Sequence, residues 1–140
     1  MFRKLLSLII VLMVAALVYI PVFAEDMDSP VDEPIIQEYQ YISTINTSLN
    51  ISGGKASASV TVDDLNNNTT KIYATMTLQK KSGGSWSNIE KWDKTTYSRT
   101  LTLSKTKAIS KGTYRLKCVI KAYKNANCET ITKYSLERKY

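Results

Sequence analysis

Residues 110–122, SKGTYRLKCVIKA, carry the pattern on which the fold class depends. Every second residue from Tyr114 to Ala122 is apolar, and lysine or arginine fills most of the positions between them. Successive side chains of a β-strand point to opposite faces of its sheet, so this alternation predicts a strand with one buried and one exposed face. Gly112 lies in the polar stretch before it, and we expect a turn there with the strand directly after it.

The same two-residue period continues through most of residues 39–140, and Gly, Asn, Asp or Ser interrupt it about every ten residues. No amphipathic helix of useful length is indicated in this region. The pattern predicts seven strands, at residues 41–51, 56–62, 72–78, 86–93, 97–103, 114–122 and 130–136. Short strands at this spacing indicate an all-β, seven-stranded antiparallel β-sandwich of immunoglobulin-like type, although a small barrel has similar spacing.

Tyr114 favours the sandwich. Immunoglobulin-like domains have a tyrosine near the start of the sixth strand, and its hydroxyl bonds to the backbone of the turn before it. Gly112 and Thr113 put Tyr114 in this position, so we expect it to be buried, with its hydroxyl within about 3 Å of a backbone group near residues 109–111. Antibody domains have a cysteine two residues after this tyrosine, where the present chain has Leu116, so the sandwich would lack their disulfide between the sheets.

The first 24 residues match the three-part pattern of a secretory signal peptide. Arg3 and Lys4 form a basic start, residues 5–20 are mostly apolar, and residues 22–24 (VFA) fit a cleavage site. We therefore expect a signal-peptide helix, cleavage after Ala24, and a protein that is secreted or associated with the cell wall. An uncleaved membrane anchor is the alternative, but the apolar run of 16 residues is shorter than the roughly 20 residues that span a bilayer.

Charge divides the remaining chain into two parts. Residues 25–38 contain six acidic residues, no basic residue and two prolines, which predicts a flexible acidic leader outside the sandwich. Residues 39–140 contain 17 Lys and Arg against six Asp and Glu, a net charge of +11. A basic secreted domain favours an anionic partner, such as a cell-wall polymer or an acidic glycan, although lysines spaced singly along strands also serve only to solvate a sheet. We expect no nucleic-acid partner and no stable membrane anchor after signal cleavage, and the sequence does not indicate an oligomeric state.

The chain contains no histidine and only two cysteines, which excludes histidine-activated nucleophiles and the usual structural zinc sites. Glu90 and Asp93 flank a tryptophan and are the best-placed carboxylates for glycoside hydrolysis, but a small sandwich offers no obvious catalytic pocket. The spacing of Asp64, Asn66 and Asn68 matches the first half of a calcium loop, and threonines replace the Gly and Glu of the second half. We therefore expect no enzyme, no catalytic residue, no cofactor and no metal site.

Residues 78–95, LQKKSGGSWSNIEKWDKT, predict a hairpin that contains both tryptophans of the chain. A two-residue turn at residues 83–84 would put Ile89 inside and both tryptophans outside. A bulge between Ile89 and Trp92, near residues 90–91, would move Trp92 into the core, and burying an indole contributes roughly 2–3 kcal/mol. We therefore expect this bulge, with Ile89 and Trp92 buried.

Trp86 is the candidate ligand contact of this hairpin. We expect its ring to be half exposed and packed on lysine stems, with Lys80 and Lys81 beside it. An anionic cell-wall polymer or a glycan would meet the ring and the two lysines, although single exposed aromatic rings are common on protein surfaces. A regular strand without the bulge would instead expose Trp86 and Trp92 on one face as a paired platform for sugar rings.

A tight turn near Asn125 decides how the two cysteines lie. It sets Tyr123 opposite Cys128, and Cys118 opposite Lys133, so the cysteines are about five residues or roughly 16 Å apart along the sheet. A disulfide needs Cα atoms within about 7 Å, so we expect Cys118 to be a free core residue and Cys128 a surface thiol. Secretion argues for a bridge, which would require a different local backbone.

Four segments of the chain resemble a family of small, signal-peptide-bearing proteins of Gram-positive bacteria that is catalogued as a domain of unknown function. They are ISGGKASASVTV, LQKKSGGSWSNIEKW, SKGTYRLKCVIKAY and ETITKYS, within residues 41–138. The resemblance implies a secreted, all-β protein associated with the cell surface, and it transfers no catalytic residue. We expect a non-enzymatic binding or cell-envelope-associated module. The alternative is a secreted effector or small toxin that acts on membranes or competitors.

Overall fold

The alternating pattern forms strands along most of the chain that the computed structural model describes, residues 38–140. The predicted signal peptide, its helix and residues 25–37 of the predicted leader lie outside the described residues. All seven predicted strands are present in the described part, together with a short eighth one, so the all-β prediction is confirmed. The strands are β1 (Ile42–Ser52), β2 (Lys55–Asp64), β3 (Lys71–Ser82), β4 (Ser85–Thr96), β5 (Thr100–Ala108), β6 (Thr113–Lys124), β7 (Asn127–Tyr134) and β8 (Arg138–Lys139).

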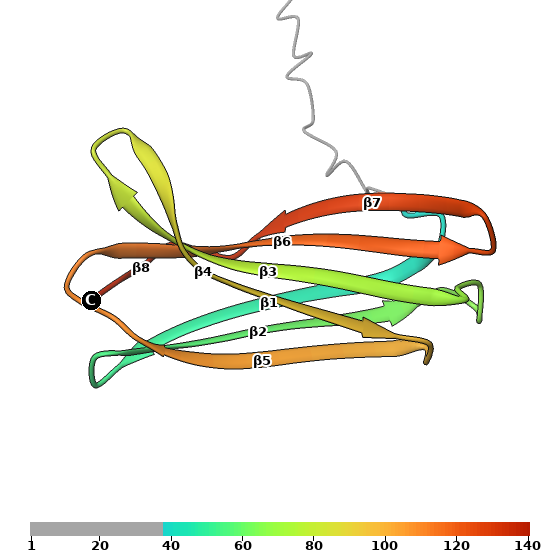
Figure 1. The fold of residues 1–140 in the computed structure, drawn as a ribbon, viewed down its shortest axis with the longest axis horizontal. Coiled ribbons are helices and arrows are strands. Elements are labelled where there is room, and N and C mark those ends of the chain that lie inside the picture. Colours follow the sequence, from blue (N-terminus) through green and yellow to red (C-terminus); the bar gives the residue numbers. More distant parts are fainter. Residues whose placement is uncertain (1–37) are drawn as a thin grey trace, which may run out of the picture. The chain divides into compact units, whose positions relative to one another are not determined.

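The strands form two separate antiparallel sheets (Figure 1). The three-stranded sheet has the order β1-β2-β5. The five-stranded sheet has the order β4-β3-β6-β7, and β8 also pairs with β6. Apolar side chains of both sheets belong to one core, so the arrangement is sandwich-like rather than one closed barrel.

The core lies between the two sheets, and β6 is central to it. The inward residues of β6, from Tyr114 to Ala122, are at most 1% exposed, as the sequence period predicts. Burying one medium-sized apolar side chain contributes about 1.5–3 kcal/mol, so this shared core is the main source of stability. The other core residues with no exposed surface are Ala56, Val60 and Val62 of β2, Ile72, Ala74, Met76 and Leu78 of β3, and Leu101 of β5.

Tyr114 closes the turn between β5 and β6. Its side chain is 1% exposed, and its hydroxyl donates a hydrogen bond of 2.8 Å to the carbonyl oxygen of Ser110. The predicted burial of Tyr114 and its bond to the preceding turn are therefore confirmed. The bond lets a polar hydroxyl lie in the core without losing its hydrogen-bond partner.

Lys80 covers this turn. Its Nζ donates a hydrogen bond of 2.8 Å to Ser110 Oγ and lies 5.6 Å from the centroid of the Tyr114 ring. Gly112 has a φ of 155°, and a Cβ at this position would lie 2.5 Å from Lys80 Cε. The glycine therefore leaves room for the lysine stem that packs over the tyrosine.

Two cations reach from the five-stranded sheet to the main chain of the three-stranded sheet. Lys94 Nζ on β4 donates a hydrogen bond of 2.6 Å to the carbonyl oxygen of Thr102 on β5. Arg138 Nε on β8 donates a hydrogen bond of 3.2 Å to the carbonyl oxygen of Leu49 on β1. Because β5 and β1 are the two edge strands of the three-stranded sheet, these bonds join the sheets on both sides.

Several predicted strands extend too far at one end, and at two of these ends a large side chain is exposed. Tyr97, predicted in the fifth strand, lies between β4 and β5 and is 81% exposed, and Leu136, predicted in the seventh, lies between β7 and β8 and is 73% exposed. The early end of β7 before Leu136 is explained by Ser135, because the Leu116 amide donates a hydrogen bond of 2.8 Å to Ser135 Oγ. A side-chain hydroxyl thus takes the place of a backbone carbonyl and interrupts the strand.

Replacing Tyr114 by Phe should lower the free energy of unfolding by about 1 kcal/mol, because the ring stays buried and only the bond to Ser110 is lost. Urea denaturation followed by tryptophan fluorescence measures the change. Tyr97→Phe is the matched control, since the Tyr97 side chain is 81% exposed, and it should leave the stability unchanged. Equal stability of the two variants would contradict a stabilising role for the Tyr114 hydroxyl.

Candidate functional site

The outer face of the five-stranded sheet is strongly cationic. Odd-numbered residues of β3 and β6 point outward, opposite to their buried even-numbered neighbours. The register adds the outward residues of β4 and β7, and among the outward positions of these four strands Asp93 is the one acidic residue. The cations of this surface, called the cationic face below, are Lys71, Lys81, Lys91, Arg115, Lys117 and Lys121.

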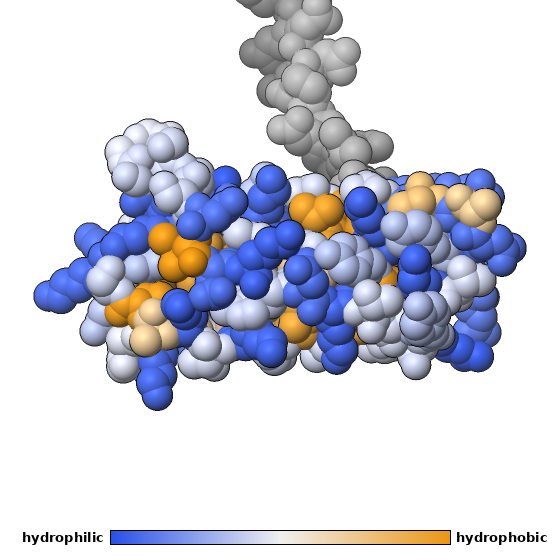
Figure 2. All heavy atoms as spheres, viewed as in Figure 1, coloured by the Kyte–Doolittle hydropathy of each residue, from blue (hydrophilic) through white to orange (hydrophobic). Residues whose placement is uncertain are grey.

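The outer face of the three-stranded sheet has a different composition. Its central positions hold uncharged hydroxyl and amide side chains, in register across the three strands, around a shallow hollow of about 440 Å³. In the view of Figure 2, strongly hydrophilic and near-neutral side chains together cover most of the visible surface, and hydrophobic ones form small separate areas. The uncharged positions are Asn46, Ser48 and Asn50 of β1, Ser57, Ser59 and Thr61 of β2, and Thr102, Ser104 and Thr106 of β5.

Arg115 is the centre of an arginine–aromatic cluster on the cationic face. Its Cζ lies 4.2 Å from the centroid of the Trp86 ring and 4.4 Å from that of Tyr134. Its Nε donates a hydrogen bond of 2.9 Å to Gln79 Oε1, and Gln79 Nε2 donates one of 2.9 Å to Asn88 Oδ1. The cluster therefore uses side chains from β4, β3, β6 and β7 together.

Trp86 is half-buried and packs on cations, as predicted for its ring. Lys81, its partner on β3, has its Nζ 5.5 Å from the ring centroid and 3.6 Å from Glu137 Oε2. Arg115 lies closer to the ring, and sequence reasoning did not include it. Arg115 reaches Trp86 because β6 pairs with β3, and its partner Gln79 is 36 positions away in the chain.

Lys80 is separated from Trp86 and Lys81. Its side chain points to the other side of β3, where it bonds Ser110 and covers Tyr114. Of the three residues proposed as ligand contacts, the structure therefore brings together Trp86 and Lys81 only.

The predicted bulge in β4 is present, but it lies earlier in the strand than predicted. Leu78 pairs with Glu90 and Gln79 pairs with Asn88, which leaves Ile89 as the extra residue. Ile89 is 41% exposed, so the prediction of a buried Ile89 is wrong. A bulge bends and twists its strand, and in Figure 1 the end of the β3–β4 hairpin rises away from the other strands.

The bulge turns Trp92 inward. Trp92 pairs with Met76 and packs against the core, but its side chain is only partly buried. The predicted inward orientation of Trp92 is therefore correct, and its predicted full burial is not. β4 is an edge strand of its sheet, so its inward side chains have fewer neighbours than those of β3 or β6. Trp86 and Trp92 lie on opposite faces of β4, and the paired-tryptophan platform does not form.

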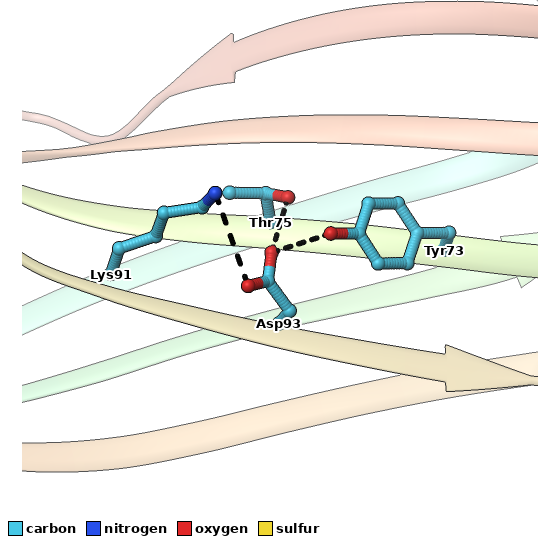
Figure 3. A network of polar contacts seen from close by, with 4 residues as sticks. All are labelled: Tyr73, Thr75, Lys91 and Asp93. Carbon is cyan, nitrogen blue, oxygen red and sulfur yellow. Dashed lines mark hydrogen bonds and ion pairs between the residues drawn. The ribbon is translucent and has the colours of Figure 1, made fainter.

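Asp93 is tied into a network of polar contacts on the cationic face (Figure 3). Its Oδ1 accepts hydrogen bonds of 2.6 Å from Thr75 Oγ1 and 2.7 Å from the Tyr73 hydroxyl, and Lys91 Nζ lies 4.0 Å from its Oδ2. The bond from Thr75, and then that from Tyr73, hold the pKa of Asp93 below its usual value. The one carboxylate among these outward positions is therefore ionised and already has partners.

Glu90 lies on the other side of β4 from Asp93. Its Oε2 is 2.9 Å from Lys107 Nζ on β5, and this hydrogen-bonded lysine lowers the pKa of Glu90. Because the two carboxylates point to opposite faces, they do not line one cleft as the pair for glycoside hydrolysis would.

A second group of aromatic rings and cations, called the tyrosine hollow below, lies at the other end of the cationic face. Lys71 Nζ is 4.1 Å from the centroid of the Tyr123 ring, a distance typical of a cation–π contact. The shallow hollow beside it has a volume of about 320 Å³. Its lining residues are Lys71, Tyr73, Thr95, Tyr97, Lys121 and Tyr123.

The partial calcium pattern forms a hydrogen-bonded turn. Asp64 Oδ1 accepts a bond of 2.9 Å from the Asn68 amide, and its Oδ2 accepts bonds from the amide and the hydroxyl of Thr69 at 3.1 and 2.9 Å. Asn66 and Asn67 have φ values of 54° and 59°, which asparagine tolerates. Within residues 38–140, no three His, Cys, Asp or Glu side chains gather in the way a metal site requires.

Both cysteines are free, as the predicted register implies. Tyr123 pairs with Cys128 and Cys118 pairs with Lys133, and Asn125 has a φ of 55° in the turn between them. Cys118 has no exposed surface, and this burial raises the pKa of its thiol to about 12. Cys128 is exposed.

No family model matches the chain, and no curated protein is significantly similar to it. The resemblance noted from its sequence segments therefore stays a prediction. In the part of the chain that the structure describes, no helix has the length and apolar character to cross a membrane.

A thiol-alkylating reagent should modify Cys128 in the native protein and Cys118 only after unfolding, because a buried thiol with a raised pKa supplies almost no thiolate. Intact-mass spectrometry should find one adduct under native conditions and two in denaturant. Cys128→Ser is the control and should give no native adduct. Rapid native modification of that variant would contradict the burial of Cys118.

Proposed function

We propose that this chain is a secreted, non-enzymatic module that binds an anionic polymer of the cell envelope through its cationic face. The observation that carries the proposal is the separation of charge between the two sheets. Six cations and one carboxylate occupy outward positions of β3, β4, β6 and β7, whereas the central outward positions of the three-stranded sheet are uncharged. Lysines that served only to solvate the protein would be expected at the central outward positions of both sheets.

Repetition of weak contacts makes a polymer the best partner for this face. One exposed ion pair contributes about 0–1 kcal/mol and is screened by salt. A single small anion would therefore bind weakly. A polymer presents its anionic groups repeatedly, and once one group is bound the next acts at a high effective concentration.

β6 supplies the direction along which the polymer would lie. Arg115, Lys117 and Lys121 follow one another on its outward side, with the arginine–aromatic cluster at one end and the tyrosine hollow at the other. The strand from Arg115 to Tyr123 rises by roughly 26 Å. Affinity should therefore increase with polymer length until the polymer spans this distance.

The strand order supports an immunoglobulin-like type for the fold. In constant-type immunoglobulin domains the fourth strand joins the first, second and fifth, and the other sheet contains the third, sixth and seventh. Here β4 joins β3, β6 and β7, and the rest of the distribution is the same. The bond from the Tyr114 hydroxyl to Ser110 supports the same assignment, because it has the form of a tyrosine corner.

Secretion is proposed from the sequence of residues 1–24, which has the three parts of a signal peptide. The resemblance to small proteins of Gram-positive bacteria supports a location at the cell surface.

Replacing Lys117 and Lys121 together by Ala should lower the affinity for a glycerol phosphate polymer by roughly tenfold at low salt, because two weak ion pairs together contribute about 1.4 kcal/mol. Isothermal titration calorimetry at low and high salt, with neutral dextran as the control ligand, measures the change. Lys55→Ala with Lys105→Ala is the matched control on the three-stranded sheet and should have a much smaller effect. Failure of the unsubstituted protein to bind at low salt would refute the proposed function.

Asp93→Asn should strengthen binding to the same polymer, because it removes the one carboxylate from the outward positions of the cationic face. The lowered pKa of Asp93 keeps it charged as pH falls through the usual range for aspartate. The difference between the two proteins should therefore persist through that range and disappear only at more acid pH. Glu90→Gln, on the opposite side of β4, is the control. Unchanged affinity of Asp93→Asn would show that the polymer does not approach this part of the sheet.

A further inference from the structure

We infer that Arg115 is the residue that recognises the anionic group itself. The free edge of its guanidinium would receive two oxygens of one phosphodiester or carboxylate group, while Trp86 and Tyr134 hold its plane in position. This role rests on the proposed binding of an anionic polymer. It names the chemical group that is bound and distinguishes Arg115 from the lysines around it.

The guanidinium of Arg115 has donors left for a ligand. An arginine side chain carries five N–H donors in a fixed planar fork. Its Nε uses one of them on Gln79 Oε1, and within residues 38–140 the Nη groups have neither a hydrogen bond nor an acidic partner. The carboxylate of Glu137 pairs with Lys81, the lysine beside Trp86, at 3.6 Å from its Nζ. The outer edge of the fork is therefore available to two acceptor oxygens.

The guanidinium is also held before a ligand arrives. Gln79 is 7% exposed, and both ends of its amide are bonded, to Arg115 Nε and to Asn88 Oδ1. Trp86 on β4 and Tyr134 on β7 lie within 4.4 Å of the guanidinium carbon, so one ring comes from each side of β3 and β6. Ordering a long side chain normally reduces affinity, and here most of that ordering precedes binding.

Lysine cannot replace arginine in this position. An ammonium group is a compact charge with no planar fork, so it attracts an anion without fixing the orientation of two oxygens. Bidentate arginine contacts with phosphate or carboxylate are both stronger and more specific in geometry. The lysines of the cationic face would therefore supply general attraction, and Arg115 would align one anionic group of the polymer.

Arg115→Lys separates the two contributions, because it keeps the positive charge and removes the fork. We expect its affinity for a glycerol phosphate polymer to fall roughly tenfold, with little change in salt dependence. Arg99→Lys is the matched control, since it makes the same exchange in the chain between β4 and β5, and it should bind like the unsubstituted protein. Thermal unfolding of both variants shows whether a loss of binding reflects a loss of fold.

A measurement on the unsubstituted protein requires no variant to fold. Dimethyl phosphate and acetate are titrated separately while NMR follows the arginine side-chain N–H signals, with sodium chloride as the control for ionic strength. We expect the Arg115 signals to shift more than those of Arg99 and Arg138. The stronger of the two titrations identifies a phosphodiester or a carboxylate as the preferred group.

Two results would overturn this role, and they can be told apart. If Arg115→Lys binds like the unsubstituted protein and neither small anion shifts the Arg115 signals, while Lys117→Ala with Lys121→Ala still weakens binding, the cationic face acts by charge alone. If the unsubstituted protein binds no anionic polymer and the Arg115 signals do not move, the proposed function fails together with the role of Arg115.

Discussion

The pairing of β3 with β6 is the contact on which both the core and the candidate site depend. Its register sets Leu78 beside Leu116 on the inner face and, one residue further, Gln79 beside Arg115 on the outer face. A slip of one residue would exchange the two faces, because side chains alternate along a strand. Each core residue that would then face water costs about 1.5–3 kcal/mol. The register that buries the core therefore also fixes the positions of Gln79 and Arg115 on the outer face.

The range over which residues interact explains which parts of this structure were predictable. The strand positions follow from the local alternation of apolar and polar residues. The free state of the cysteines follows from the tight turn at Asn125, because both cysteines lie within a few residues of that turn. Arg115 meets Trp86 only because β3 lies between β4 and β6, and no local period encodes that order. The bulge was predictable in part. The sequence indicates that one extra residue is needed after the hairpin turn if Trp92 is to point inward. The position of that residue, Ile89, goes together with a contact between Glu90 and Lys107 on β5, which is distant in the chain.

The two outer faces differ in side-chain length as well as in charge. The three-stranded sheet carries short hydroxyl and amide groups, whereas the five-stranded sheet carries long cations and aromatic rings. Lys117 and Lys121 are partly buried although they point outward, as is usual for lysines whose apolar stems cover a protein surface. The same residues therefore cover the strands and present the charge.

Lys94 and Arg138 each donate a hydrogen bond to a backbone carbonyl oxygen on an edge strand of the three-stranded sheet. An edge with a continuous row of free carbonyl and amide groups can take up a strand from another molecule, which is one route to aggregation. A cationic side chain that bonds to one of these carbonyl oxygens leaves it unavailable to an incoming strand. It also places a positive charge where that strand would lie. These two contacts therefore make both edges of the three-stranded sheet less able to pair with a strand from another molecule.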